Sequence, residues 1–281
     1  EGIKQAKRNY TGEAATMDVD KLREYIQSFC LNDCPLGNQG YTRILLQLFG
    51  FLGHGKSSLI NSCKFALLGK GFKKHAEAAA NDGGLTMERK SYQLTGNITM
   101  VDNRGCAMIN PYEMAEIYAQ LCNFVPLDER VEWNQNYEDM MFRLEDDDVN
   151  PNFADFVVPI FVYSVKKAIS GREIDEIQPF LKNCRDLTGI FPIIVLTNKT
   201  SGDFAELRNI FEGMGAEEIL AVENYTDEDH FKTRGRHTLF LELIHKALKD
   251  VSFCMKEQRD PIRDRAQRKK FLLKYVHERD L

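Results

Sequence analysis

The sequence lacks any hydrophobic run long enough to cross a bilayer, and no secretory signal is visible. The longest apolar run, residues 153–165, contains Asp155 and Pro159 and is typical of a buried strand. Its seven cysteines are odd in number and scattered, which does not match a disulfide framework and favours a reducing, cytoplasmic compartment. A net charge of −5 gives no general reason to expect a nucleic-acid partner.

The sequence also has few cysteines spaced as zinc ligands usually are. Cys30 and Cys34 form the one close pair, and no second pair with zinc spacing accompanies them, which argues against a zinc site. The length of 281 residues provides enough material for one large domain or two small ones.

The clearest chemical signal lies in residues 50–57. An apolar run, residues 42–49, leads into the stretch Gly50-Phe51-Leu52-Gly53-His54-Gly55-Lys56-Ser57, which has the G-x-x-x-x-G-K-S pattern of a phosphate-binding loop. Glycines allow the backbone amides to approach phosphate oxygens, and the helix expected over residues 56–68 adds its positive dipole end. Lys56 is predicted to reach the β- and γ-phosphates, and the Ser57 hydroxyl to bind Mg²⁺. The alternative is a chance match at an ordinary glycine turn.

Two strand-like runs, residues 89–94 and 98–102, follow the loop helix. Thr95-Gly96-Asn97 joins them and has the length and residue types of a tight hairpin. The second run ends at Asp102-Asn103-Arg104-Gly105, a D-x-x-G pattern. Its carboxylate can hold Mg²⁺ through water, and the Gly105 amide can contact a γ-phosphate; the alternative is an ordinary turn. Thr86, just before the hairpin, is predicted to complete the metal shell.

The remaining periodicities alternate strands with helices. Strands are expected at residues 153–165, 190–196 and 216–222, and helices at 110–122, 172–187, 203–214 and 239–251. This order predicts an α/β fold of three layers, in which helices cover both faces of a mostly parallel sheet with one antiparallel hairpin strand. A ligand is expected at the carboxyl ends of the strands, where the loop, Asp102 and Asn198 all fall.

The predicted organisation has one main domain, residues 39–252, between two extensions. Residues 1–38 are a polar lead followed by a helix capped by Asp18. Within the domain, residues 123–152 form an acidic, irregular insertion containing Trp133, which is either solvated surface or a partner surface. Residues 253–281 are expected to form a basic helical extension. The favoured interpretation is that it packs back on the domain or continues into a second domain, and the alternative is that it binds a membrane or an acidic partner.

Over residues 40–251 the chain resembles the P-loop GTPase superfamily. Gly50–Ser57 is similar to its phosphate loop, Thr86 to its first switch, Asp102–Gly105 to its second, and Asn198-Lys199 to the first half of its base-reading N-K-x-D motif. The hairpin after the loop helix also resembles the Ras-like layout. Among subfamilies, the helical lead-in, Ser58 and Glu223-Asn224-Tyr225 resemble the interferon-inducible GTPase-like proteins, in particular the interferon-induced protein forty-four family.

The resemblance implies a GTP- or GDP-binding protein that requires Mg²⁺, forms a homodimer through its nucleotide face and acts in an interferon response. It implies metal ligation by Ser57, Thr86 and Asp102, and catalytic roles for Lys56, Thr86 and Arg104. Nucleotide contacts are implied for Gly50, Leu52, Gly53, His54, Gly55, Lys56, Ser57, Ser58, Gly105, Asn198, Lys199, Glu223 and Asn224.

Two departures from the family pattern bear on activity. Ser201 stands where the base-reading aspartate is expected, so guanine preference should be weakened unless Asp203 substitutes. Cys106 stands where many members have a water-orienting glutamine, and Leu52 crowds the approach of an arginine finger. Slow hydrolysis is therefore expected, with Arg104 and His54 as substitutes near the phosphates.

These departures leave two rival functions. One is a pseudo-GTPase, an interaction module that binds little nucleotide. The other is an ATP-using P-loop kinase, which would need an arginine-rich lid that residues 123–152 do not resemble.

Overall fold

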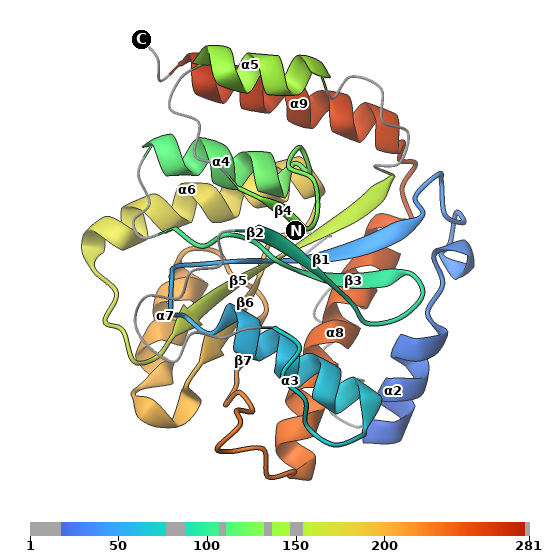
Figure 1. Ribbon diagram of the computed structural model, residues 1–281, viewed down its shortest axis with the longest axis vertical. Helices are drawn as coiled ribbons and strands as arrows, with labels where there is room; N and C mark the ends of the chain where they lie inside the picture. The colour runs from blue at the N-terminus through green and yellow to red at the C-terminus, as the bar shows by residue number, and fades with distance from the viewer. Residues whose placement is uncertain (1–17, 77–87, 107–110, 132–136, 147–153, 279–281) are drawn as a thin grey trace.

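The computed structural model describes residues 18–76, 88–106, 111–131, 137–146 and 154–278. In this part of the chain, seven strands form one sheet in the order β4-β2-β3-β1-β5-β6-β7 (Figure 1). The parallel strands are β1 (Arg43–Phe49), β3 (Ile98–Asp102), β5 (Asp155–Ser164), β6 (Ile193–Thr197) and β7 (Ile219–Ala221). The strand β2 (Glu88–Gln93) runs antiparallel to β3 and to the two-residue β4 (Glu129–Arg130). The prediction of a mostly parallel sheet with one antiparallel hairpin strand is confirmed.

Helices cover both faces of this sheet (Figure 1). On one face lie α2 (Val19–Ser28), α3 (Lys56–Leu68) and α8 (Arg234–Cys254), which share a buried apolar cluster with alternate residues of β5. On the other face lie α4 (Pro111–Leu121), α6 (Gly171–Thr188) and α7 (Phe204–Gly213), with a second cluster. Short 3₁₀ turns, η2 (Leu31–Asp33) and η3 (Lys199–Ser201), lie in connections.

Strand β5 shows why both faces need covering. All ten of its residues are buried, and successive side chains contribute alternately to the two apolar clusters. The apolar run that predicted this strand is thus explained by burial on both sides. Asp18 caps α2 as predicted, and its carboxylate accepts a hydrogen bond from the Val19 amide.

The prediction that residues 123–152 are irregular was wrong for two segments. Strand β4 and the helix α5 (Tyr137–Asp146) lie within them. The side chains of Met140 and Leu144, one helical turn apart, are buried, and Arg143 forms two hydrogen bonds with the fully buried Glu116 of α4. An acidic composition concealed this apolar face. Trp133 lies outside the described residues.

The C-terminal segment forms α9 (Pro261–His277), which lies beside α5 above α4 and α6 (Figure 1). Leu272 and Val276 are buried, and the Tyr41 hydroxyl donates to Asp264 at 2.6 Å. The helix therefore packs back on the domain, as favoured from the sequence.

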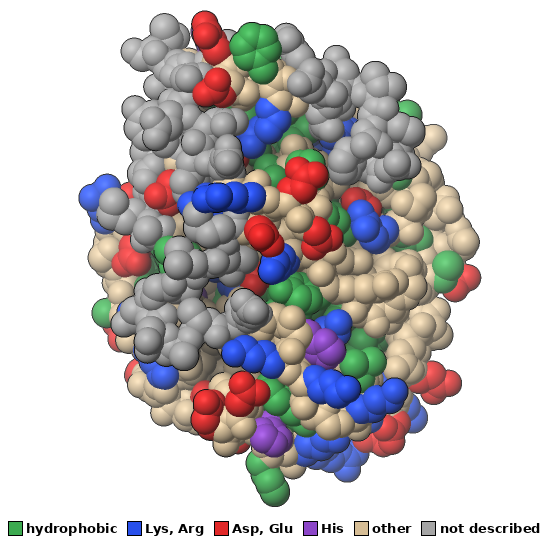
Figure 2. Space-filling model, viewed as in Figure 1, with side chains coloured by type: hydrophobic (Ala, Val, Ile, Leu, Met, Phe, Trp, Pro, Cys, Tyr) green, Lys and Arg blue, Asp and Glu red, His purple; other side chains and the backbone are tan. Residues whose placement is uncertain are grey.

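Acidic and basic side chains are interspersed on the face that Figure 2 shows. Among the described residues, no helix combines the length and apolar character that a membrane span requires.

Candidate functional site

The turn after β1 takes conformations that require glycine. Gly50, Gly53 and Gly55 have φ values of 140°, 74° and 89°. A Cβ at Gly50 would lie 2.2 Å from the Val162 carbonyl oxygen, so no other residue fits there. The first hydrogen bond within α3 runs from the Leu59 amide to the Gly55 carbonyl, at 2.9 Å. The amides of residues 56–58 therefore have no acceptor within the helix and suit an anion at its N-terminus.

Lys56 occupies the centre of this turn. Its Nζ donates to the carbonyls of Gly50 at 3.1 Å and Phe51 at 3.0 Å, and the residue is 7% exposed. Burial lowers the pKa of Lys56, while the nearby Asp102 carboxylate opposes this shift. A Cβ added to Gly105 would lie 2.6 Å from this Nζ. The loop and the D-x-x-G segment thus meet at one ammonium group.

Ser57 and Asp102 form the second contact between the two segments. The Ser57 hydroxyl donates to Asp102 Oδ2 at 2.5 Å, and Oδ1 is buried without a hydrogen-bond partner among the described residues. Burial raises the pKa of the Asp102 carboxyl, which the charge of Lys56 opposes. A hydroxyl beside a carboxylate with an unused oxygen is a donor set that fits Mg²⁺. Thr86, the third predicted ligand, lies outside the described residues.

The described residues contain no group of three or more His, Cys, Asp and Glu side chains able to hold a metal ion. Mg²⁺ needs no such cage, because it usually retains several waters and takes one or two protein oxygens together with phosphate oxygens. The donor set of Ser57 and Asp102 fits this mode of binding. Cys30 and Cys34 are both free thiols.

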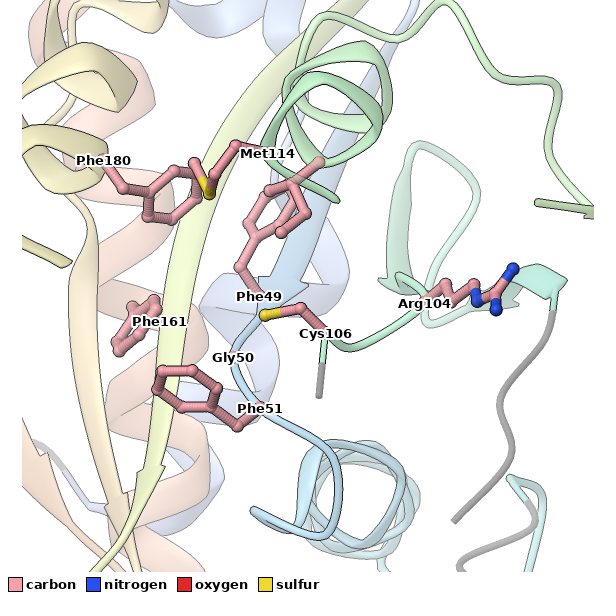
Figure 3. A pocket seen from close by; sticks show the side chains of 9 residues that line it. Phe49, Gly50, Phe51, Arg104, Cys106, Met114, Phe161 and Phe180 are labelled. Carbon is pink, nitrogen blue, oxygen red and sulfur yellow. The ribbon is translucent and has the colours of Figure 1, made fainter. Parts of the chain in front are cut away.

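Beyond Gly105, the segment pairs with the loop as a short parallel bridge. Phe51 pairs with Cys106, and the Leu52 amide donates to the Cys106 carbonyl at 3.1 Å. The Cys106 thiol is buried, which raises its pKa to about 12. It lines a small apolar cavity of about 10 Å³, roughly one water, shown in Figure 3 and bordered by Phe49, Gly50, Phe51, Arg104, Met114, Ile117, Phe161 and Phe180. A neutral thiol in this setting cannot orient water as a glutamine amide would.

The two side chains expected to substitute in catalysis are engaged elsewhere. His54 Nδ1 accepts a hydrogen bond from the Ser164 amide at 3.2 Å, and burial lowers its pKa to about 3, so the ring is neutral at pH 7. The Arg104 guanidinium contacts the Val131 carbonyl and extends away from Gly50 in Figure 3. His54 therefore ties the loop to β5, and Arg104 ties the D-x-x-G segment to the turn beside β4.

The residues predicted to contact the base gather at the ends of β6 and β7. Asn198 Nδ2 donates to Ser164 Oγ at 2.8 Å and contacts Thr197 Oγ1 at 3.4 Å. Thr197 Oγ1 in turn donates to the His54 carbonyl at 2.8 Å. Asn198 is thus linked through Thr197 to the loop of residues 50–57. The ammonium of Lys199 lies 5.5 Å from the centre of the Phe204 ring.

Glu223 and Asn224 connect the segment after β7 to the same rim. The Glu223 carboxylate accepts from the amide and hydroxyl of Thr200, at 3.0 and 2.8 Å, and Asn224 Nδ2 donates to the Gly55 carbonyl at 3.1 Å. Ser201 is exposed, whereas Asp203 caps α7 by accepting from the Ala205 amide. Asp203 is therefore held as a helix cap rather than directed to a base.

Sequence reasoning missed the side chains that support the site. Thr197 links Asn198 to the loop, and a buried group of Gln47, Arg89 and Asn103 lies behind the D-x-x-G segment. One signal was present in the sequence, because Gln47 interrupts an otherwise apolar run. The partner of Arg89 could not be found without the strand register.

The fold and site define an α/β protein with a mixed, mostly parallel seven-stranded sheet in its described part, consistent with a Rossmann-like or P-loop-like fold. Neither a scan against protein-family models nor a search of curated proteins found a match to this chain.

Proposed function

We propose that this protein is a Mg²⁺-dependent, guanine-nucleotide-binding protein of the P-loop GTPase type, in which hydrolysis is slow and nucleotide state controls self-association. The observation that carries the proposal is the meeting of Lys56, Ser57, Asp102 and Gly105 at one rim of the sheet. The loop after β1, the D-x-x-G segment after β3 and Asn198 after β6 all reach this rim at the carboxyl ends of parallel strands, which is where α/β sheets bind ligands. The guanine preference and the homodimer rest on the resemblance of Asn198-Lys199 and of the loop.

In this proposal each segment has a defined task. The amides of residues 56–58 and the Lys56 ammonium bind the phosphates, and Ser57 and Asp102 would hold the metal ion. Mg²⁺, when bound, neutralises phosphate charge. Asn198 and Asn224 fix the loop from the base side, and the Lys199 stem covers the base plane.

The direct test is a calorimetric titration of the purified protein with GTP, GDP and ATP in the presence of Mg²⁺. We expect heat of binding with GTP and GDP. We also expect the affinity for GTP to exceed that for ATP by less than it would with an aspartate at position 201. Absence of heat with all three nucleotides would favour the pseudo-GTPase module, which Ser201 and the apolar setting of Cys106 also favour. Binding of ATP alone would favour the kinase alternative.

Single-turnover hydrolysis of GTP should be slower than about 1 s⁻¹, the lower end of typical enzyme turnover. The reason is that Cys106 faces an apolar cavity, and Arg104 is bonded away from the loop. An arginine finger can supply about 10³–10⁵-fold in rate, and the structure places no such group at the rim among the described residues. Cys106→Ala should leave the rate within about threefold, since a neutral thiol performs no step. A faster wild-type reaction, or a large loss in Cys106→Ala, would contradict this account.

Asp102→Asn should weaken binding of a non-hydrolysable GTP analogue by about tenfold with Mg²⁺ present, and far less with EDTA, because one charged metal contact is lost. The unfolding free energy should not fall, because the variant removes a buried carboxylate whose pKa burial raises. Asp128→Asn is the matched control, since this exposed carboxylate bonds Ser91 away from the loop. Equal losses with Mg²⁺ and with EDTA would show that Asp102 does not act through metal.

A further inference from the structure

Arg89 is a fully buried arginine on β2, whose other side chains are half-buried or exposed. Its Nε donates to Asn103 Oδ1 at 3.1 Å, Nη1 contacts the Val125 carbonyl, and Nη2 is buried with no hydrogen-bond partner among the described residues. A buried charge without complete bonding is costly, and an apolar side chain of the same length would avoid this cost. Stability alone does not explain an arginine at this position.

The carboxylate whose charge favours the protonated form of Arg89 most is that of Asp155, and it is hydrogen-bonded to other side chains. Asp155 forms two hydrogen bonds of 2.9 Å with Arg43 and accepts a third from Asn123 at 3.0 Å. Burial lowers the pKa of Arg89 to about 9, against the opposing charge of Asp155, so the guanidinium stays charged at neutral pH. The charge of Arg89 is therefore directed at Asn103 and Val125 rather than neutralised in an ion pair.

The side-chain amide nitrogen of Asn103 contacts β1. Its Nδ2 lies 3.2 Å from both Gln47 Oε1 and the Leu48 carbonyl, and the residue is fully buried. Gln47 in turn donates to the Leu121 carbonyl at the end of α4, at 3.4 Å. Arg89 thus completes a buried polar network that crosses three strands and reaches α4.

This network fixes the middle of the D-x-x-G segment. Asn103 lies between Asp102 and Arg104, and the Arg104 amide donates to Gln120 Oε1 of α4 at 2.9 Å. Asp102 contacts Ser57, and Gly105 lies against the Lys56 ammonium. The placement of both functional ends therefore depends on the bonds that hold Asn103.

We propose that Arg89 is a positioning residue that acts through Asn103 to hold the D-x-x-G segment against the phosphate loop. Its effect on ligands rests on the proposed function, in which Mg²⁺ and the γ-phosphate meet this segment and the α- and β-phosphates meet the loop. Arg89 then controls the preference for a nucleoside triphosphate over a diphosphate without touching either.

The first test is hydrogen exchange in Arg89→Met, which removes the guanidinium donors and keeps an unbranched apolar chain in place of the aliphatic part of the arginine. The amides of Leu52 and Arg104 report on the segment, because they donate to the Cys106 carbonyl and to Gln120 Oε1. We expect both to exchange about tenfold faster, as the loss of roughly one hydrogen bond predicts. The control is Arg268→Met, a buried arginine on α9 that donates to the Leu187 carbonyl, far along the chain from this segment. Unchanged exchange in Arg89→Met, or an equal change in the control, would overturn the proposal.

The second test compares the affinities for a non-hydrolysable GTP analogue and for GDP, both with Mg²⁺. Arg89→Met should lower the ratio of the two affinities by about tenfold, and Asn103→Ala should do the same. The double variant, Arg89→Met with Asn103→Ala, should lower this affinity ratio no further than either single variant, because both changes remove the same hydrogen-bonded link. Arg89→Lys, which keeps the charge but loses the forked donors, should recover the ratio only in part. An unchanged ratio despite faster exchange would refute the role in ligand preference. If wild-type protein binds no nucleotide, the proposed function fails, while faster exchange in Arg89→Met would still support positioning by Arg89.

Discussion

Lys56→Met is expected to weaken the binding of GTP and GDP by at least about a hundredfold, because two charge-assisted hydrogen bonds to phosphate would be lost. The same change should also lower the unfolding free energy, by roughly 1–3 kcal/mol, because the Gly50 and Phe51 carbonyls lose their buried donor and removal of the buried ammonium offsets only part of that cost. In the structure this ammonium is bonded to the Gly50 and Phe51 carbonyls, and burial lowers its pKa. A stability loss of this size should leave the protein folded, so the loss of nucleotide affinity can be measured separately from it.

Calorimetry and chemical denaturation of the same preparations measure the two effects. Lys64→Met is the matched control, because it lies on the same helix, is half-buried, and its pKa is also lowered by burial. It should bind nucleotide as wild type does. If Lys56→Met bound as tightly as Lys64→Met, the phosphate-loop assignment would fail, and with it the proposed function.

The parts of the fold that the sequence predicted are those specified by local pattern. The alternation of apolar runs with helical periodicity located β1, the β2–β3 hairpin, β5 and β6, and the handedness of crossover connections then leaves few sheet orders. Gly50 and Gly55 signalled the loop because no other residue tolerates its backbone angles and close contacts.

The parts that were missed depend on contacts between distant segments. Helix α5 was hidden by its acidic composition, because Met140 and Leu144 are the buried apolar side chains among those that the structure describes along it. The D-x-x-G motif names Asp102 and Gly105 but assigns nothing to the two residues between them. Asn103 gains its role from Arg89, which only the antiparallel register of β2 brings to it.

The directions of two candidate catalytic side chains also depend on contacts between distant segments. The sequence places His54 within the loop of residues 50–57 and Arg104 next to the D-x-x-G glycine, but it says nothing of where their side chains point. His54 packs its ring edge against Tyr163, with ring centres 4.6 Å apart, and Arg104 is directed to the Val131 carbonyl. The sequence therefore located the backbone of these two residues but not the direction of their side chains.

Three buried histidines predict that the protein loses stability in mild acid. Burial lowers the pKa of His54 to about 3, and of His237 and His245 to about 4 each, with nearby lysines and arginines adding to the effect. In the unfolded chain each titrates near 6.5. Between these values the unfolded state binds more protons than the folded state, so stability is fully present above about pH 6.5 and falls as pH decreases.

The loss should continue until pH drops below the folded-state values, near 4 for His237 and His245. Each histidine contributes up to roughly 1.4 kcal/mol per pH unit within its window. His237 and His245 each have one buried ring nitrogen without a partner among the described residues, so protonation there gains no hydrogen bond to offset desolvation. Asp102 acts in the opposite direction, because its raised pKa makes protonation favourable in the folded state.

Urea denaturation at pH 7.5, 6.5, 5.5 and 4.5 measures the slope. His245→Phe should reduce it by one histidine's share, because the ring contact with Tyr25, at 4.8 Å between centres, is kept while the titrating group is removed. Thr238→Ser, a change on the same helix that removes no titrating group, should leave the slope as it is in wild type. A constant unfolding free energy across this range would mean that these imidazoles are not held neutral by burial. The packing of α8 against α2 and α3, which shields His237 and His245, would then have to be looser than the structure has it.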